Sequence, residues 1–170
     1  MMEAPGDTLA DRFAAAFRSH PAGVAIITAD DGAGPTGLTA TSVISVSARP
    51  ALLAFSLSAR SSAAPRIAAA GAVVVHLLGA GQVELAKRFA TGGIDRFAPP
   101  CRWHRLPTGE PVLSGVDTWL RGRITEQLTV GGSTLVVVEV DHVRPGRDQD
   151  VPLVYRDRTW YSLDEQAVMT

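Results

Sequence analysis

The last third of the chain is a succession of β-strand patterns separated only by short turns. Runs rich in Val, Leu, Thr and aromatic residues cover 118–130, 133–143, 152–156 and 159–163. Gly131-Gly132 supplies a turn between the first and second runs, and Arg156-Asp157 supplies a turn between the third and fourth. Pro145-Gly146 supplies a turn between the second and third runs. Strands connected this directly pair antiparallel, because parallel strands need long crossover connections.

The earlier part of the chain adds further strand patterns and few helices. Strand patterns lie at 24–29, 38–46, 51–58 and 72–78. Three helices are predicted. The first begins after Asp7 or Thr8, the second ends before Gly71, and the third covers 79–90. The alternation in 38–46 slips between Val43 and Ile44, which indicates a bulge or a bend.

The segment from Thr91 to Ser114 has four prolines and no clear period. A connection this long is usually functional or covers another part of the fold. The remaining patterns give seven or eight strands and three short helices, which is not a βαβ alternation. We therefore predict an all-β fold in which one domain, spanning 1–170, forms an antiparallel barrel with peripheral helices.

Composition excludes several classes of partner. The net charge is −1 with no basic run, so we expect no nucleic-acid partner. No stretch has the roughly 18 consecutive apolar residues of a membrane span, and acidic residues occupy the N-terminus where a signal peptide needs basic ones. The lone Cys101 cannot form an internal disulfide. These features predict a soluble cytoplasmic protein.

Common catalytic and metal-binding motifs are missing. Gly32–Gly37 matches the glycine pattern of dinucleotide sites, but Pro35 and a strand follow where such a site needs a helix, so we interpret it as a turn. The four histidines lack the spacing of metal ligands, and Cys101 with His104 is an isolated pair. No Gly-x-Ser-x-Gly is present. We expect no metal and assign no catalytic residue.

Two clusters of hydroxyl side chains follow one another in 37–67. Thr39, Thr41, Ser42 and Ser45 belong to the first cluster, and Ser56, Ser58, Ser61 and Ser62 to the second. The second cluster precedes a predicted helix and is flanked by Arg60 and Arg66, a combination typical of a phosphate site. The alternative is a strand face of small residues that packs against a neighbour.

Five segments together resemble the flavin reductase-like family, the FMN-binding split barrels. They are "HPAGVAIITA", "GLTATSVISVSARPALLAFSLSARSS", "VVVHLLGAGQVELAKRFA", "DRF" and "PLVYRDRTWY". The family includes the small reductase components of two-component flavin-dependent monooxygenases. The resemblance implies a Greek-key split barrel with its core at about 13–162. It also implies a homodimer, FMN or FAD near the subunit interface, and NADH or NADPH as hydride donor.

The resemblance also implies a set of flavin-binding residues. The isoalloxazine ring is expected against Thr39, Ala40, Thr41 and Ser42, with Ser56, Leu57 and Ser58 continuing that wall, and the phosphate against Arg60, Ser61 and Ser62. His76 either contacts the flavin or is a hydrogen-bonded core histidine. Lys87, Arg88 and Phe89 match a helix end near the cofactor, although Phe89 also suits a core position.

One departure from the family leaves the function open. Relatives commonly have Gly-Asp-His where this chain has Gly131, Gly132 and Ser133, and that histidine is thought to lie near the nicotinamide. The leading hypothesis is an NAD(P)H-dependent flavin reductase that supplies a partner monooxygenase. The alternatives are a protein that retains its flavin without turnover and a flavin-free dimeric binding module.

Three basic side chains near the barrel mouth are candidates to replace the missing histidine. His142 lies too far along its strand to occupy the vacated position. Arg156 and Arg158 are better suited, because a guanidinium can pair with a pyrophosphate. The alternative is that both arginines are solvated hairpin charges.

Overall fold

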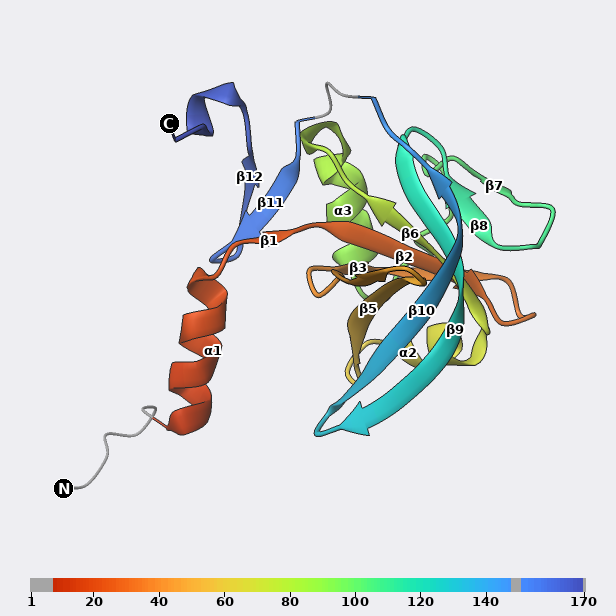
Figure 1. Ribbon diagram of the computed structural model, residues 1–170, viewed down its shortest axis with the longest axis horizontal. Coiled ribbons are helices and arrows are strands. Elements are labelled where there is room, and N and C mark those ends of the chain that lie inside the picture. Colours follow the sequence, from red (N-terminus) through yellow and green to blue (C-terminus); the bar gives the residue numbers. More distant parts are fainter. Residues whose placement is uncertain (1–7, 148–150, 170) are drawn as a thin grey trace.

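A computed structural model describes residues 8–147 and 151–169 (Figure 1). The helices are α1 (Leu9–Ser19), α2 (Ala64–Ala69) and α3 (Val83–Ala90), with short 3-10 turns η1 (Ala80–Gln82) and η2 (Glu165–Ala167). The strands are β1 (Ala22–Gly23), β2 (Ala25–Asp30), β3 (Pro35–Ala40), β4 (Ile44–Ala48), β5 (Ala51–Ser58), β6 (Ala72–Leu77), β7 (Trp103–Arg105), β8 (Pro111–Leu113), β9 (Thr118–Val130), β10 (Ser133–Arg144), β11 (Leu153–Arg156) and β12 (Thr159–Ser162). No helix among the described residues has the length and apolar character needed to cross a membrane.

A seven-stranded antiparallel sheet forms the body of the molecule. Its strand order is β3-β2-β6-β9-β10-β5-β4, and it curls around an apolar interior (Figure 1). The pairs β2–β6 and β5–β10 are not consecutive in the chain, so the connections cross over as in a Greek key. The edge strands β3 and β4 are joined by residues 41–43, where the wall is split. The predicted antiparallel split barrel is confirmed.

Local features of β9 and β10 allow this long hairpin to bend with the wall. The register between the two strands shifts between Val137 and Val138, and again between Val140 and His142. Gly122 lies where β9 approaches β10 most closely, since a Cβ there would be 2.4 Å from the carbonyl oxygen of Glu139. Only glycine permits this approach without moving the backbone.

Apolar side chains form one core inside the barrel and another outside it. Leu53, Phe55 and Val136 belong to the inner core, and Ile67 of α2 closes one end of it. The outer core packs α3 and the following loop against the outer face of β2, where Ile26 is fully buried.

The segment that sequence analysis left irregular forms much of the outer layer. Within 91–114, β7 and β8 make a hairpin that the sequence did not reveal. The Thr28 hydroxyl donates to the Pro111 carbonyl oxygen at 2.5 Å, and the Leu113 N–H donates to His76 Nε2 at 3.0 Å. The segment therefore covers the outer face of β2 and β6.

Helix α1 projects from the barrel beside the small sheet β1-β11-β12 (Figure 1). The predicted cap is present: the Thr8 hydroxyl accepts from the Asp11 N–H at 3.2 Å, and the Asp11 carboxylate accepts from the Thr8 N–H at 3.1 Å. No residue of α1 is buried. Its apolar stripe therefore has no partner within the described part of the chain.

Candidate functional site

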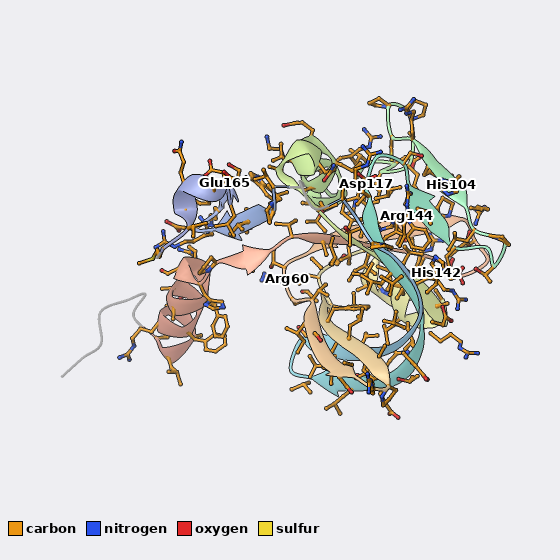
Figure 2. All side chains as sticks on the ribbon, turned by 45° about the horizontal axis from the view of Figure 1, so that its top comes forward. Arg60, His104, Asp117, His142, Arg144 and Glu165 are labelled. Atoms are coloured by element: carbon orange, nitrogen blue, oxygen red, sulfur yellow. The ribbon has the colours of Figure 1, made fainter. Side chains whose placement is uncertain are left out.

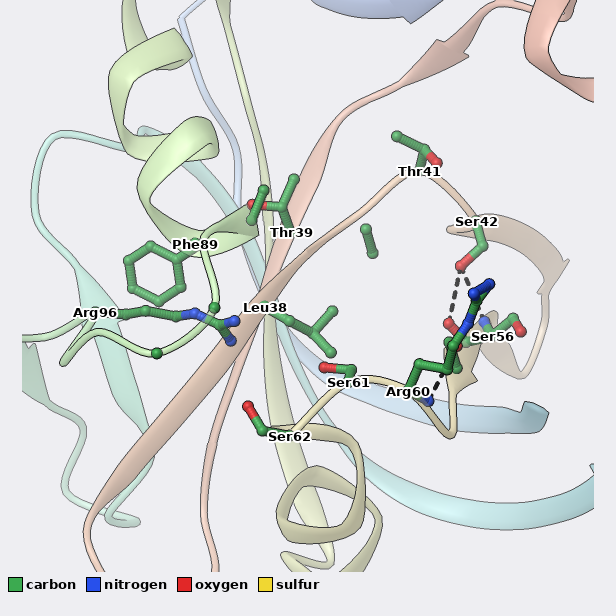
Figure 3. A pocket seen from close by; sticks show the side chains of 15 residues that line it. Leu38, Thr39, Thr41, Ser42, Ser56, Arg60, Ser61, Ser62, Phe89 and Arg96 are labelled. Atoms are coloured by element: carbon green, nitrogen blue, oxygen red, sulfur yellow. Dashed lines mark hydrogen bonds between the residues drawn. The ribbon is translucent and has the colours of Figure 1, made fainter. Parts of the chain in front are cut away.

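A pocket of about 630 Å³ opens where the barrel wall is split (Figure 3). This volume is in the range of small-molecule sites. The lining residues come from the end of β3, the end of β5 and its turn, and the end of α3 with its loop. They are Leu38, Thr39, Ala40, Thr41, Ser42, Ser56, Ser58, Arg60, Ser61, Ser62, Phe89, Ala90, Gly92, Gly93 and Arg96.

The predicted bend in the first hydroxyl-rich segment is the split itself. One strand was expected over 38–46, but β3 ends at Ala40 and β4 begins at Ile44. Across the gap, Ser42 Oγ accepts from the Ser56 N–H at 3.0 Å and donates to the Ser56 carbonyl oxygen at 3.2 Å (Figure 3). The backbone of residues 41–43 has no ladder partner in the sheet, which leaves it available to the edge of a flat, polar ligand.

The wall formed by α3 depends on close contact with β3. Thr39 Oγ1 donates to the Ala86 carbonyl oxygen at 2.6 Å, so this hydroxyl anchors the helix. Phe89 is fully buried and also lines the pocket. Its ring lies against the bare backbone of Gly37, where a Cβ would come within 2.9 Å of it. Phe89 is thus both a core residue and part of the pocket wall.

The turn after β5 brings a guanidinium and two hydroxyl groups to the pocket. The Ser61 N–H donates to the Ser58 carbonyl oxygen at 3.0 Å, and the Arg60 N–H donates to Ser58 Oγ at 3.3 Å, which fixes the turn. The Arg60 guanidinium has no partner among the described residues, and the hydroxyls of Ser61 and Ser62 border the same cavity. A free guanidinium beside hydroxyl groups is a typical phosphate-binding arrangement.

The loop after α3 brings a second arginine to the pocket. Arg96 Nη1 donates to the Gly37 carbonyl oxygen at 2.6 Å, and its Nε donates to the Thr91 carbonyl oxygen at 3.0 Å. Burial lowers the pKa of Arg96, but a guanidinium still carries its charge at neutral pH. Arg96 was not among the residues predicted from the sequence, and its only signal was its place in the quoted "DRF".

Most of the residues predicted for the flavin lie together in this pocket. Thr39, Ala40, Thr41, Ser42, Ser56, Ser58, Arg60, Ser61, Ser62 and Phe89 all line it. Leu57 does not, because alternate residues of β5 face opposite sides and Leu57 points into the barrel core with 2% of its surface exposed. The pocket therefore gathers the hydroxyl residues of both clusters except Ser45, which lies on β4.

His76 is not part of the pocket wall. Its ring is fully buried, Nδ1 lies 3.1 Å from the Ile26 carbonyl oxygen, and Nε2 accepts from the Leu113 N–H. Nδ1 therefore carries the ring proton and donates a hydrogen bond to the Ile26 carbonyl oxygen. Burial lowers the pKa of His76 to about 4, which keeps the ring neutral. The geometry favours the core alternative over flavin contact.

Lys87 and Arg88 also point away from the pocket. Lys87 Nζ pairs with Glu84 Oε1 at 2.7 Å on the outer face of α3. Arg88 donates to the carbonyl oxygens of Asp95, Arg96 and Ala98, at 2.7 to 2.9 Å. Both border a different cavity. Arg88 instead holds the loop that carries Arg96.

Neither of the other sequence features gives a second site. Asp30 Oδ1 accepts from the N–H groups of Gly32 and Gly34, so the glycine pattern is a turn as predicted. Arg66, which flanks the second hydroxyl cluster, is held by Asp31 in two hydrogen bonds of 2.6 and 3.0 Å. Within 8–147 and 151–169, no three His, Cys, Asp or Glu side chains group as metal ligands would.

Comparison with known proteins identifies the family of this fold and pocket. The family described as "Flavin reductase like domain" matches residues 17–164. The chain belongs to the flavin reductase-like family. That match includes every residue that lines the pocket.

Named relatives and a solved structure agree with this assignment. The chain is 43% identical over 152 residues to an NADH:FMN oxidoreductase of Rhodococcus qingshengii, covering 88% of this chain and 79% of the relative. It is 34% identical over 156 residues to the 4-hydroxyphenylacetate 3-monooxygenase reductase component of Salmonella typhimurium, covering 89% and 91%. A crystal structure of a flavin reductase domain protein from Arthrobacter sp. FB24 superposes with a TM-score of 0.85 at 39% identity, covering 91% and 95%.

Proposed function

We propose that this protein is an NAD(P)H-dependent flavin reductase that binds FMN, or the FMN half of FAD, in the pocket at the barrel split. One observation carries the proposal, the meeting of two kinds of polar group in one cavity. At one end lie the Ser61 and Ser62 hydroxyls and the Arg60 guanidinium, which has no partner among residues 8–147 and 151–169; the other wall is the backbone of residues 41–43, which has no ladder partner in the sheet. The first end suits a phosphate, and the second suits the polar edge of the ring.

The remaining lining residues fit a flat ring. Ala40, Ala90, Gly92 and Gly93 have little or no side chain, so a planar heterocycle can lie close to the wall. A flavin held there would supply the hydride acceptor and a dihydronicotinamide would supply the hydride, with the accompanying proton coming from solvent. The protein's task is to hold the two rings in contact and to position the phosphate, so it needs no acid or base of its own.

We propose that the protein supplies reduced flavin to a partner monooxygenase. The 4-hydroxyphenylacetate 3-monooxygenase reductase component is a relative named for such a system. The cytoplasm is the compartment in which we place the protein, because NADH is regenerated there. A reduced Cys101 is compatible with this location.

We also propose that the working unit is a homodimer. Large apolar side chains are exposed on α1, where Phe13 and Phe17 are 63% and 61% exposed, and on the edge strand β4, where Ile44 is 60% exposed. An unpaired edge strand and an uncovered apolar helix face are features that association would remove. A second copy of this chain is the occupant that we propose for these surfaces.

A second function has one observation in its favour. The turn of Gly131 and Gly132 lies beside β5, where the Gly132 carbonyl oxygen accepts from the Ala59 N–H at 2.9 Å, and it carries no histidine. Because this histidine is missing, the alternative function is a protein that retains its flavin and does not act as a reductase.

A spectrum and an assay distinguish the two functions. The protein is titrated with FMN, FAD and riboflavin while the visible absorbance is followed, and NADH or NADPH oxidation is then measured with each flavin. The proposal predicts oxidation that depends on both donor and flavin. Flavin binding without oxidation of either donor would establish the flavin-retaining alternative.

A further inference from the structure

The loop after α3 presents polar groups to the flavin pocket that the fold itself does not use. Gly92 and Gly93 line the pocket. Within the described part of the chain, the N–H groups of Gly92, Gly93 and Ile94 have no hydrogen-bond partner. Gly93 has a φ of 73°, in the left-handed region that favours glycine. Successive free N–H groups around such a residue form a concave donor surface that suits an anion.

Arg96 adds a cation to the same surface. Its Nη1 and Nε are used by the carbonyl oxygens of Gly37 and Thr91, but its Nη2 has no partner among residues 8–147 and 151–169. The Arg96 side chain lines the flavin pocket, so this part of the guanidinium is available to a ligand.

This surface lies at the end of the pocket to which we assign the flavin phosphate. A smaller cavity of about 250 Å³ adjoins the flavin pocket, and Ser62, Gly93 and Arg96 line both cavities. In Figure 3, the guanidinium groups of Arg96 and Arg60 lie on either side of Ser61 and Ser62. The two arginines therefore approach the same place from opposite walls.

A second cation is needed there because a phosphate monoester carries nearly two negative charges at neutral pH, and Arg60 supplies one positive charge. Figure 2 shows His104, His142 and Arg144 well apart from Arg60, and none of the three lines the pocket. The His142 ring instead lies 5.1 Å from that of Trp119. Arg96 is thus the second cation at this end of the pocket.

Arg88 holds the loop in place although it does not line the pocket. Its Nε donates to the Arg96 carbonyl oxygen at 2.7 Å, and its Nη2 donates to the carbonyl oxygens of Asp95 and Ala98 at 2.9 and 2.8 Å. Arg88 itself borders a different cavity. Because one guanidinium binds three carbonyl oxygens, replacing it would free residues 92–96 to move away from the pocket.

We propose that residues 92–96 are a second phosphate-binding wall of the flavin pocket, with Arg96 as its cation and Arg88 as the residue that positions it. The inference rests on the proposed function, in which the pocket holds a flavin. A phosphate between Arg60 and Arg96 meets a guanidinium from each wall, and the N–H groups of residues 92–94 supply further donors. Arg88 is a positioning residue, since it acts through the loop.

Titration with FMN and with riboflavin, which lacks the phosphate, tests the positioning role. In Arg88→Gln we expect the Kd for FMN to rise about tenfold, the range of one charge-assisted contact, and the Kd for riboflavin to stay unchanged. Arg88→Lys is expected to restore part of the FMN affinity, because lysine keeps a charged donor. Arg102→Gln, at an exposed position, makes the same change of charge and is the matched control. Equal losses for both ligands, or no loss in Arg88→Gln, overturn the proposal.

Hydrogen exchange in the wild type tests the wall without any variant. We expect FMN to slow the exchange of the amides of residues 92–94 more than riboflavin does. Equal protection by the two ligands, or no protection, overturns the proposal. A wild type that shows this protection by FMN but oxidises neither NADH nor NADPH would refute the reductase function and leave the phosphate-binding wall in place. A wild type that binds no flavin would refute both.

Discussion

At the scale of single residues, hydroxyl groups in the pocket divide into two kinds. Those of Thr39 and Ser42 are used by the fold, since one anchors α3 and the other bridges the split. Those of Ser61 and Ser62 border the cavity next to Arg60, whose guanidinium has no partner in the described part of the chain. This division supports the proposed phosphate end of the pocket at Arg60, Ser61 and Ser62, in the second of the two hydroxyl clusters.

Replacing Arg60 tests this location. We expect Arg60→Gln to weaken FMN binding by about ten- to a hundredfold, because one charge-assisted contact contributes roughly 1.5–3 kcal/mol. Riboflavin lacks the phosphate, so its affinity is expected to be the same in the variant and the wild type. Arg123→Gln, at an exposed position on β9, is the control. Equal losses for FMN and riboflavin would show that Arg60 does not contact the phosphate.

His76 gives a pH dependence of stability. Its pKa falls from about 6.5 in the unfolded chain to about 4 in the folded protein. As the pH falls, the unfolded state therefore takes up a proton at His76 before the folded state does. The free energy of unfolding decreases as the pH falls from 6.5 to 4, by up to about 1.4 kcal/mol per pH unit. Urea denaturation at several pH values measures this slope. His76→Gln is expected to flatten the slope in this window, and an unchanged slope would rule out a neutral buried ring.

At the scale of elements, the split in the barrel is the feature that makes the site. The sequence predicted the strands, the antiparallel pairing and a bend near Val43, because these depend on local pattern and turn residues. It did not predict Arg96, whose bond to Gly37 spans 59 residues, or the β7–β8 hairpin in a proline-rich segment. His76 was left open for the same reason, since its two partners come from distant segments.

Two glycines test the close contacts between elements. We expect Gly37→Ala to lower the free energy of unfolding by about 1–3 kcal/mol and also to weaken FMN binding, because the added Cβ displaces Phe89 from the pocket wall. Gly122→Ala is expected to lower stability at the β9–β10 contact and to leave the FMN affinity of the folded protein unchanged. Gly132→Ala is the control, since no atom lies within 4 Å of a Cβ there. Denaturation measures the stability of each variant, and flavin titration measures its FMN affinity. Equal FMN affinity in all three variants would show that Phe89 is not part of the flavin site.

At the scale of the whole molecule, the exposed apolar surfaces point to association. Sedimentation at micromolar concentration is predicted to give a dimer, and the double variant Phe13→Ser, Phe17→Ser is predicted to shift it toward monomer. Val168→Ser, at a position that is 69% exposed near the C-terminus, is the control. A monomeric wild type that still binds FMN tightly would contradict the proposed dimer.

A crystal structure with bound FMN tests most directly the proposal that the pocket at the split between β3 and β4 is the flavin site. We predict a phosphate within hydrogen-bonding distance of the Arg60 guanidinium and the Ser61 and Ser62 hydroxyls. The ring is predicted to lie against residues 39–42. A phosphate bound away from Arg60, or a flavin bound outside this pocket, would contradict it.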